Sequence, residues 1–412
     1  MKRKNHVLVI GGGAAGMTAA ISARRLGAAV TILEKNPRVG KKILATGNGR
    51  CNFTNINTGV EHYNGSNPKF VHSALASFSA EDTIRFFEKL GIQHKVEDGG
   101  KVFPMSDQAS SVLDVLLYEL NSLGVDIVCD ACVKDITGEK GSFAVKLENG
   151  KVYRGDRVII AAGGKAMPSS GSDGSGFELA KKLGHAIVPV FPALVQLMLE
   201  GPFFKAVSGV KFVGTAGIVH NNKLAAMDRG DILFANYGVS GPPILQISRK
   251  AGELLNEGEE VFLKITVLDT FTADELKLLI KKRFRNGSRK PADFAMVGLI
   301  NKRLIPVVLK EAGVNDLKRP AASLSDGELE RIARVLTDWR FRIRGTKGWQ
   351  SAQVTAGGVS TDEIDPGTME SRLVKGLYFA GEIMDIDGQC GGFNLQWAWS
   401  SGFVAGQNAA IL

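Results

Sequence analysis

A glycine motif near the start of the chain constrains the fold more than any other feature. The apolar run Val7–Ile10 has the length and β-branching of a buried strand, and the pattern Gly-x-Gly-x-x-Gly follows it directly at 11–16. An Ala- and Leu-rich stretch over 14–26 suits a helix, and a second apolar run ends at Glu34. A dinucleotide-binding βαβ unit requires this order of strand, glycine turn, helix, strand and acid. The sequence therefore predicts a Rossmann-like α/β fold with a dinucleotide site.

Each part of this unit meets a different steric or electrostatic demand. The first glycine permits the tight turn, the second lets the backbone approach a pyrophosphate, and the third lets helix and strand pack closely. The helix that follows presents unpaired N–H groups and a positive dipole end to phosphate. The acid lies about 20 residues further on, where a carboxylate accepts hydrogen bonds from ribose hydroxyls. The predicted contacts are Gly11, Gly13, Ala14, Ala15, Gly16 and Glu34.

The dinucleotide is predicted to be FAD. The chain contains a single full glycine fingerprint, whereas an enzyme that holds FAD and a nicotinamide in two Rossmann halves normally shows two. Two later strands end in glycine, at 158–164 and at 376–382, and a helix opens near 391–396. The N-terminus of that helix can face the flavin pyrimidine ring, where negative charge develops on reduction. The predicted contacts from these segments are Ala161, Ala162, Gly163, Gly164, Gly381, Glu382, Gly391, Gly392, Phe393, Asn394 and Leu395.

Five motifs in order along the chain resemble the BaiN-like (YhiN-like) family of bacterial NAD(P)/FAD-dependent oxidoreductases. They are GKKILATGNGRCNFTN at 40–55, NYGVSGPPIL at 236–245, VTAGGV at 354–359, FAGE at 379–382 and GGFNLQ at 391–396. The family is a distant relative of the fumarate-reductase flavoprotein group. The resemblance implies FAD as the cofactor and an oxidoreductase activity.

The resemblance also assigns the first of these motifs to the cofactor. It implies that the backbone of Thr46, Gly47, Asn48 and Gly49 lies against the flavin ring, with Cys51 and Asn52 in the same loop. Arg50 has two interpretations, because a guanidinium can hold an anionic group or serve as a structural ion-pair partner. Lys35 and Lys42 are candidate partners on the phosphate or adenosine side, and the Val133 backbone is a candidate adenine contact.

Changes of pattern along the chain predict three parts. Short β-branched runs such as 207–213 and 261–267 indicate a barrel, and capping boxes at Thr272 and Ser325 indicate helices. The expected fold is α/β: a glutathione-reductase-type FAD-binding domain over 1–190 and 356–412, a β-barrel-like insert over 191–268 and 337–355, and a small helical insert over 269–336.

The four cysteines do not predict a metal or disulfide framework. Cys129 and Cys132 have Cys-x-x-Cys spacing but lack a second ligand pair, and we expect both inside a strand over 125–133. Cys51 and Cys390 are expected to pack near the cofactor rather than to form a redox pair. No His, Tyr or acid is identified as the catalytic acid or base.

The net charge of +9 is densest at 281–290 and on Arg340, Arg342 and Arg344. We favour the explanation that these basic residues lie on solvent-exposed faces, so a nucleic-acid partner is not expected. No apolar run reaches the roughly 18 residues of a membrane helix, and the run behind the basic start breaks into glycines, so a cytoplasmic protein is expected. The oligomeric state is left open.

The favoured function is an FAD-dependent oxidoreductase that acts on a small organic substrate, fed by transiently bound NAD(P)H. Two alternatives stay open. One is an oxidase or dehydrogenase reduced by its own substrate, for example an amine. The other, of a different class, is an RNA-binding or tRNA-modifying flavoprotein, in which the basic insert contacts phosphates.

Overall fold

The computed structural model describes residues 5–286 and 289–411. They divide into two compact units, each of which is described by itself. Unit 1 comprises the chain up to Pro192 and from Trp349 onward, and unit 2 comprises Ala193–Gly348.

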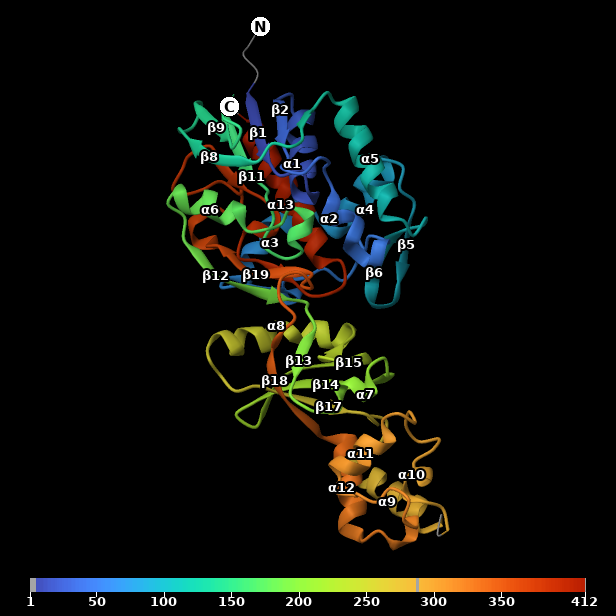
Figure 1. The fold of residues 1–412 in the computed structure, drawn as a ribbon. Helices are drawn as coiled ribbons and strands as arrows, with labels where there is room; N and C mark the ends of the chain where they lie inside the picture. Colours follow the sequence, from blue (N-terminus) through green and yellow to red (C-terminus); the bar gives the residue numbers. More distant parts are fainter. Residues whose placement is uncertain (1–4, 287–288, 412) are drawn as a thin grey trace. The chain divides into compact units, whose positions relative to one another are not determined.

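A five-stranded parallel sheet forms the centre of unit 1, in the order β20-β11-β1-β2-β7. Its strands β11, β1 and β2 are labelled in Figure 1. Ile10 pairs with Leu33 on one side and with Ile160 on the other, and Ile160 pairs with Phe379. These strands therefore end at the same level, and the segments that follow them meet at one edge of the sheet. The strands are β1 (His6–Ile10), β2 (Ala29–Leu33), β7 (Asp126–Val128), β11 (Arg157–Ile160) and β20 (Leu377–Phe379).

Two helices, α1 (Ala14–Arg25) and α13 (Phe393–Ala410), pack together beside this sheet (Figure 1). Their contact depends on glycine. A Cβ added at Gly402 would lie 2.4 Å from the Ala15 carbonyl oxygen, and one at Gly406 would lie 2.2 Å from that of Ala19. Because the two backbones touch, the small residues of both helices bring the two ends of the chain together.

Smaller elements complete unit 1. The three-stranded antiparallel sheet β10-β9-β8 extends it on one side, and the hairpin of β5 and β6 pairs with β3 on another. The helices are α2 (Lys41–Ala45), α3 (Val71–Ser77), α4 (Ala80–Lys89), α5 (Ala109–Ser122) and α6 (Ser175–Lys182). The strands are β3 (Thr54–Asn55), β4 (Tyr63–Asn64), β5 (His94–Glu97), β6 (Lys101–Pro104), β8 (Val133–Thr137), β9 (Phe143–Leu147), β10 (Val152–Gly155), β12 (Ile187–Ala193), β19 (Val354–Val359) and β21 (Asp387–Gly388).

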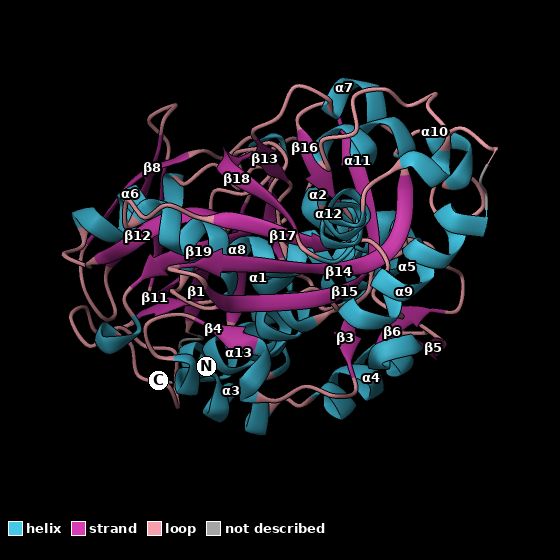
Figure 2. Ribbon diagram, turned by 90° about the horizontal axis from the view of Figure 1, so that it is seen from below, coloured by secondary structure: helices cyan, strands magenta, loops and turns pink. Residues whose placement is uncertain are grey.

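Unit 2 contains a closed six-stranded barrel in the order β13-β16-β15-β14-β17-β18, which confirms the predicted barrel. Phe234, Trp339 and Phe341 fill its interior with aromatic contacts. The two longest strands described, β14 and β15, lie side by side (Figure 2). The strands are β13 (Leu197–Leu199), β14 (Lys211–His220), β15 (Lys223–Ala235), β16 (Gly238–Ser240), β17 (Phe262–Thr266) and β18 (Trp339–Thr346).

The longest helices described in unit 2 are α8, α9 and α12, with 15, 14 and 12 residues. The strand expected from residue 207 begins at Lys211, because Val207 closes the helix α7 with its side chain buried. Both predicted capping boxes are present: Thr272 exchanges hydrogen bonds with Glu275, and Ser325 with Glu328. The helices are α7 (Phe204–Val207), α8 (Pro242–Asn256), α9 (Ala273–Asn286), α10 (Ala292–Ala295), α11 (Ile305–Glu311) and α12 (Asp326–Thr337).

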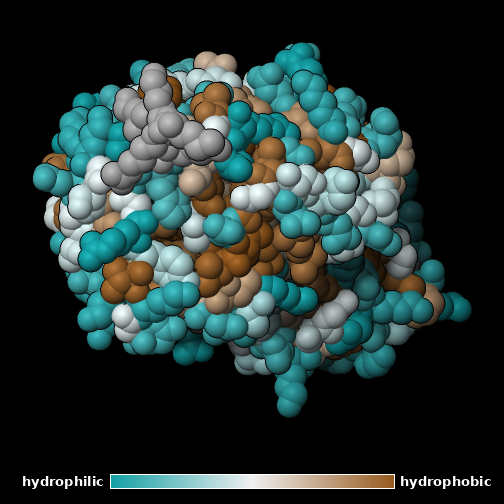
Figure 3. All heavy atoms as spheres, turned by 90° about the horizontal axis from the view of Figure 1, so that it is seen from above, coloured by the Kyte–Doolittle hydropathy of each residue, from teal (hydrophilic) through white to brown (hydrophobic). Residues whose placement is uncertain are grey.

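Among the described residues, no helix has the length and apolar character needed to cross a membrane. The face drawn in Figure 3 carries mostly hydrophilic residues around a smaller central group of hydrophobic ones.

Candidate functional site

A cleft lies at the carboxyl edge of the parallel sheet in unit 1. The segments that follow four of its strands, beginning at Gly11, Glu34, Ala161 and Ala380, all line it. Its volume is about 1280 Å³, part of which is open to solvent. Ligands of doubly wound folds bind outside the carboxyl ends of the strands, so the topology places this cleft where a dinucleotide is held.

The three glycines of the fingerprint play different parts in the cleft. Gly11 has a φ of +101°, and an added Cβ would lie 2.5 Å from the Ala161 carbonyl oxygen. At Gly16 an added Cβ would lie 1.9 Å from the Gly11 carbonyl oxygen, so this glycine serves the packing of helix on strand. At Gly13 an added Cβ meets nothing within 4 Å. Only Gly13 therefore leaves open space for a ligand that lies against the backbone.

Two helix N-termini open into the same cleft without a side-chain cap. Helix α1 begins after Gly13 and α13 after Gly392, and neither glycine carries a capping oxygen. Residues of both first turns line the cleft, namely Ala14, Ala15, Asn394 and Leu395. Uncapped first-turn N–H groups together with the helix dipole favour an anionic ligand. The cleft thus suits a dinucleotide with its diphosphate.

Glu34 is 7% exposed and fixed through both carboxylate oxygens. Its Oε2 accepts a 2.7 Å hydrogen bond from the Gly12 N–H, and its Oε1 accepts from the backbone and side-chain nitrogens of Asn36 at 2.9 and 2.8 Å. Carboxylate oxygens have further lone pairs, so Glu34 can still accept from ribose hydroxyls.

Lys42 and Glu382 form an ion pair within the lining of the cleft, with 2.5 Å between Nζ and Oε2. Glu382 belongs to a short 3-10 turn, Gly381–Ile383, and its Oε1 accepts a 2.9 Å hydrogen bond from the Thr355 N–H. Lys35, also in the lining, pairs with Asp173 at 2.6 Å.

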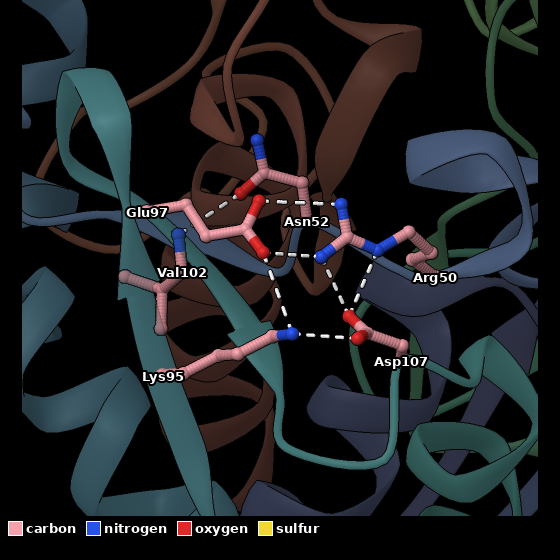
Figure 4. Close-up of polar contacts among 6 residues, drawn as sticks. All are labelled: Arg50, Asn52, Lys95, Glu97, Val102 and Asp107. Atoms are coloured by element: carbon pink, nitrogen blue, oxygen red, sulfur yellow. Dashed lines mark hydrogen bonds and ion pairs between the residues drawn. The ribbon is translucent and has the colours of Figure 1, made fainter.

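Arg50 is an ion-pair partner in this structure, as one of its two interpretations from the sequence expects. Its guanidinium donates to Glu97 and Asp107 (Figure 4). It also lies over the Phe103 ring, 4.1 Å from the centroid. Lys95 bridges the same two carboxylates, at 3.4 Å from Glu97 and 2.6 Å from Asp107. Hydrogen bonding to Arg50 lowers the pKa of Glu97, and hydrogen bonding to Lys95 lowers the pKa of Asp107.

This Arg50 cluster (Arg50, Lys95, Glu97 and Asp107) joins the loop 46–52 to the β5–β6 hairpin. The loop has an uncommon backbone, with φ values of +55° at Asn48 and +61° at Cys51. Asn52 adds a further tie, because its Oδ1 accepts from the Val102 N–H at 3.2 Å (Figure 4). Non-glycine residues hold positive φ only where the surroundings enforce it, so the cluster helps to fix this loop.

The cysteines have different environments. Cys51 is fully buried, and burial raises its pKa to about 12. Cys390 is exposed. The expectation of one strand over 125–133 was wrong: β7 ends at Val128, β8 begins at Val133, and Cys129 and Cys132 lie in the loop between them. That loop turns at Asp130, whose φ is +52°. In the described part of the chain, no cluster of three metal-ligating side chains occurs.

The structure brings many, but not all, of the predicted cofactor residues into the cleft. Those in its lining are Gly11, Gly13, Ala14, Ala15, Glu34, Lys35, Lys42, Thr46, Val133, Ala161, Ala162, Gly163, Gly381, Glu382, Asn394 and Leu395. Those outside its lining are Gly16, Gly47, Asn48, Gly49, Arg50, Cys51, Asn52, Gly164, Gly391, Gly392 and Phe393.

Sequence reasoning missed several residues of the lining. Some adjoin a predicted contact, as Gly12, Asn36, Lys41 and Cys132 do, whereas Ser170, Gly171, Ser172 and Gln353 are far from any predicted contact along the chain. The missed residues include Gly12, Asn36, Arg38, Lys41, Cys132, Ser170, Gly171, Ser172, Gln353, Val354 and Trp397.

Fold and site together define a Rossmann-type dinucleotide-binding protein. The chain belongs to the family described as HI0933-like protein Rossmann domain, which matches residues 5–408. This match confirms the resemblance indicated by the motifs.

Relatives cover almost the whole chain. A 3-dehydro-bile acid delta(4,6)-reductase of Clostridium scindens is 39% identical over 408 residues, which are 98% of this chain and 99% of the relative. A ribosomal RNA dihydrouridine synthase of Escherichia coli is 32% identical over 403 residues, 97% of each. The structure of a 3-ketosteroid-delta4-(5alpha)-dehydrogenase from Rhodococcus jostii RHA1 shares the fold, with a TM-score of 0.50 at 16% identity over 100% of this chain and 98% of that one.

The chain is therefore an FAD-dependent oxidoreductase. The cleft fits FAD on its own evidence: open space at Gly13, two uncapped helix N-termini and a buried acid after the second strand.

Proposed function

We propose that this enzyme uses NAD(P)H to reduce a carbon–carbon double bond conjugated to a carbonyl in a small organic substrate. The similarity to the bile acid reductase over nearly the full length of both chains supports this proposal most strongly. The name of that relative specifies double bonds conjugated with a 3-oxo group. Dihydrouridine synthesis, named for the second relative, also saturates a double bond conjugated to a carbonyl. One type of reaction thus covers both relatives.

The residues of unit 1 would serve this reaction by holding the cofactor. FAD, when bound, supplies the chemistry of accepting a hydride from the nicotinamide and passing it to the double bond. The first turns of α1 and α13 would bind its anionic groups, and Glu34 would bind its ribose. The Arg50 cluster would hold the loop 46–52 in the conformation that the site requires. The nicotinamide contributes the hydride with both electrons and water supplies the proton that completes the saturation, so no other reductant is needed.

The proposal can be tested anaerobically in two stages. The purified flavoprotein is mixed first with NADPH and then with NADH, and the absorbance band of oxidised flavin is followed. The bleached enzyme is then mixed with a 3-oxo-Δ4 steroid, with the saturated 3-oxo steroid as the matched control. We expect rapid bleaching by a nicotinamide and return of the band with the unsaturated steroid only.

Two outcomes would contradict the proposal. If neither nicotinamide bleaches the flavin, the enzyme is not NAD(P)H-linked, and amines and hydroxy compounds become the donors to test. If both steroids restore the band equally, or if neither does, the double bond is not the acceptor.

The charge of unit 2 favours one second candidate, a uracil base in RNA as the substrate of the same reaction. Residues 193–348 contain 25 Lys and Arg against 17 Asp and Glu, a net charge of +8, whereas the rest of the chain contains 26 against 25. Arg340, Arg342 and Arg344 point outward from β18, because alternate residues of this strand are exposed. Binding to a ribosomal RNA fragment that weakens steeply with salt would support the candidate. Failure to bind at low salt would eliminate it.

A further inference from the structure

The Lys42–Glu382 ion pair lies within the lining of the cofactor cleft. Both side chains line the cleft and are partly shielded from solvent, with exposed fractions of 24% and 19%. Within the described residues, Glu382 is the only polar partner of the Lys42 side chain. An anionic ligand in this cleft therefore competes with Glu382 for Lys42.

The two members of the pair are held unequally. Glu382 is anchored through Oε1 by the Thr355 N–H, and Thr355 is itself fully buried. The Thr355 hydroxyl accepts hydrogen bonds from the backbone N–H groups of Lys165 and Ala166 at 2.7 and 3.0 Å. Lys42, by contrast, reaches Glu382 on a flexible four-carbon stem through one contact. If the pair opens, the lysine moves and the carboxylate stays.

Lys42 also starts from a suitable place for contact with a diphosphate. The Gly40 N–H donates a 2.9 Å hydrogen bond to the Gly12 carbonyl oxygen, which ties the beginning of α2 to the glycine turn. The two other lysines of the lining have partners elsewhere: Lys35 pairs with Asp173, and Lys41 donates to the Ser169 carbonyl oxygen at 2.8 Å.

We propose that, when FAD binds, Lys42 breaks its ion pair with Glu382 and pairs with the cofactor's diphosphate instead. The released Glu382 oxygen then accepts a hydrogen bond from a hydroxyl group of the cofactor. Before FAD binds, Glu382 would thus neutralise Lys42 in place of the cofactor's diphosphate. Its members would affect diphosphate binding with opposite signs, since Lys42 attracts the anion and Glu382 competes with it. A purely structural ion pair would give the same sign for both.

Displacement of FAD from the full-length holoenzyme by ADP tests this difference in sign. ADP carries the adenosine and the diphosphate but neither the ribityl chain nor the flavin. Flavin fluorescence reports release, and the inhibition constant of ADP is corrected with each variant's own Kd for FAD. Lys42→Met should weaken ADP binding by about 10- to 100-fold, the usual range for a hydrogen bond to a charged group. Glu382→Gln should strengthen ADP binding by about 3- to 10-fold, because it frees Lys42.

Matched controls separate this effect from a general change of surface charge. Lys181→Met and Glu178→Gln remove another Lys–Glu ion pair by the same substitutions. This pair lies on α6, with a 2.9 Å separation and both side chains more than half exposed. These variants should leave the ADP constant within about twofold of the original value. Lys42→Arg keeps the charge and should retain most of the ADP affinity.

The result that overturns the proposal is weaker ADP binding in Glu382→Gln, or no change in either cleft variant. If Lys42→Met does not fold, the sign of the Glu382→Gln effect still decides. The test measures nucleotide binding and needs no substrate, so its outcome is independent of the proposed reductase activity.

Discussion

Replacing Gly13 should separate the binding of FAD from the folding of the chain. Gly13 has φ and ψ values of −84° and −170°, which any L-residue can adopt, and an added Cβ meets no atom within 4 Å. The side chain would enter the cleft at the point where the backbone is predicted to approach the pyrophosphate. We therefore expect Gly13→Val to fold and to lose FAD.

The expected change in the free energy of unfolding is small because two effects offset each other. Gly13 is the N-cap of α1, where glycine is better than an aliphatic residue by roughly 0.5–1 kcal/mol. Removing a glycine also restricts the unfolded chain, which stabilises the folded state by about 0.4–1 kcal/mol. The cofactor-free Gly13→Ala variant should thus stay within about 1 kcal/mol of the original chain.

The expected effect on FAD is larger. Side-chain atoms forced into a filled contact cost about 1–3 kcal/mol. This cost corresponds to roughly 5- to 150-fold in affinity, with Gly13→Ala at the lower end and the bulkier Gly13→Val at or beyond the upper end. The flavin retained through gel filtration should therefore fall from the original chain to Gly13→Ala and further to Gly13→Val.

The assay combines the flavin-to-protein absorbance ratio after gel filtration with thermal unfolding of the cofactor-free chain. Gly327→Ala is a suitable control, because this glycine is exposed on α12 and an added Cβ would be 3.7 Å from its nearest neighbour. Gly16→Ala gives the opposite contrast, since its Cβ would lie 1.9 Å from the Gly11 carbonyl oxygen and should damage folding as well as binding.

Two results would refute the reasoning. A full flavin complement in Gly13→Val would remove the glycine turn from the cofactor site. A large loss of stability in cofactor-free Gly13→Ala would mean that the space beside Gly13 is not open.

Three further predictions concern charge and protonation. Arg50→Gln should weaken FAD binding more at low salt than at high salt, because the Arg50 cluster is partly exposed and its pairing is screened; an equal loss at both salt concentrations would show that the cluster does not act through charge. Cys51, whose pKa is raised to about 12 by burial, should resist iodoacetamide at mildly alkaline pH while exposed Cys390 reacts, as peptide mass spectrometry can show; alkylated Cys51 in folded protein would contradict this. Burial lowers the pKa of His185 below its ordinary value near 6.5, so at lower pH the unfolded chain takes up a proton that the folded chain does not. The free energy of unfolding should therefore fall as the pH drops below about 6.5. His185→Gln should flatten this part of the pH profile, and an unchanged slope in urea titrations would contradict the assignment.

Short-range sequence preferences correctly predicted those elements of the site that depend only on neighbouring residues. The strand–glycine–helix order, Glu34 and the helix that opens near Gly392 follow from short-range steric and capping preferences, and the structure contains all of them. The parallel register then brings segments more than a hundred residues apart to one edge.

Features that depend on long-range pairing were not predictable in the same way. The partners of Arg50 lie 47 and 57 residues along the chain, so no spacing rule distinguishes a ligand-binding arginine from a paired one. Cys129 and Cys132 were placed in a strand because an apolar run has no marker of where it turns, yet the backbone bends at Asp130. Strand β15 was not expected because most of its side chains are at least partly exposed, so its apolar pattern is weak.

The distribution of charge separates the cofactor from the rest of the function. Every residue of the cleft lining belongs to unit 1, whose charges nearly cancel, and the lining has its own cations in Lys35, Arg38, Lys41 and Lys42 beside two uncapped helix N-termini. The surplus of +8 in unit 2 is therefore not needed to bind the cofactor. Ion pairs within unit 2, such as that of Arg285 with Asp326 and that of Arg319 with Glu328, neutralise individual basic side chains but do not reduce this surplus. Since pairing between residues of one chain leaves the net charge unchanged, a surplus remains that only an external anion or solvent can balance. This surplus is the physical reason to test a structured RNA beside the small conjugated carbonyl compounds.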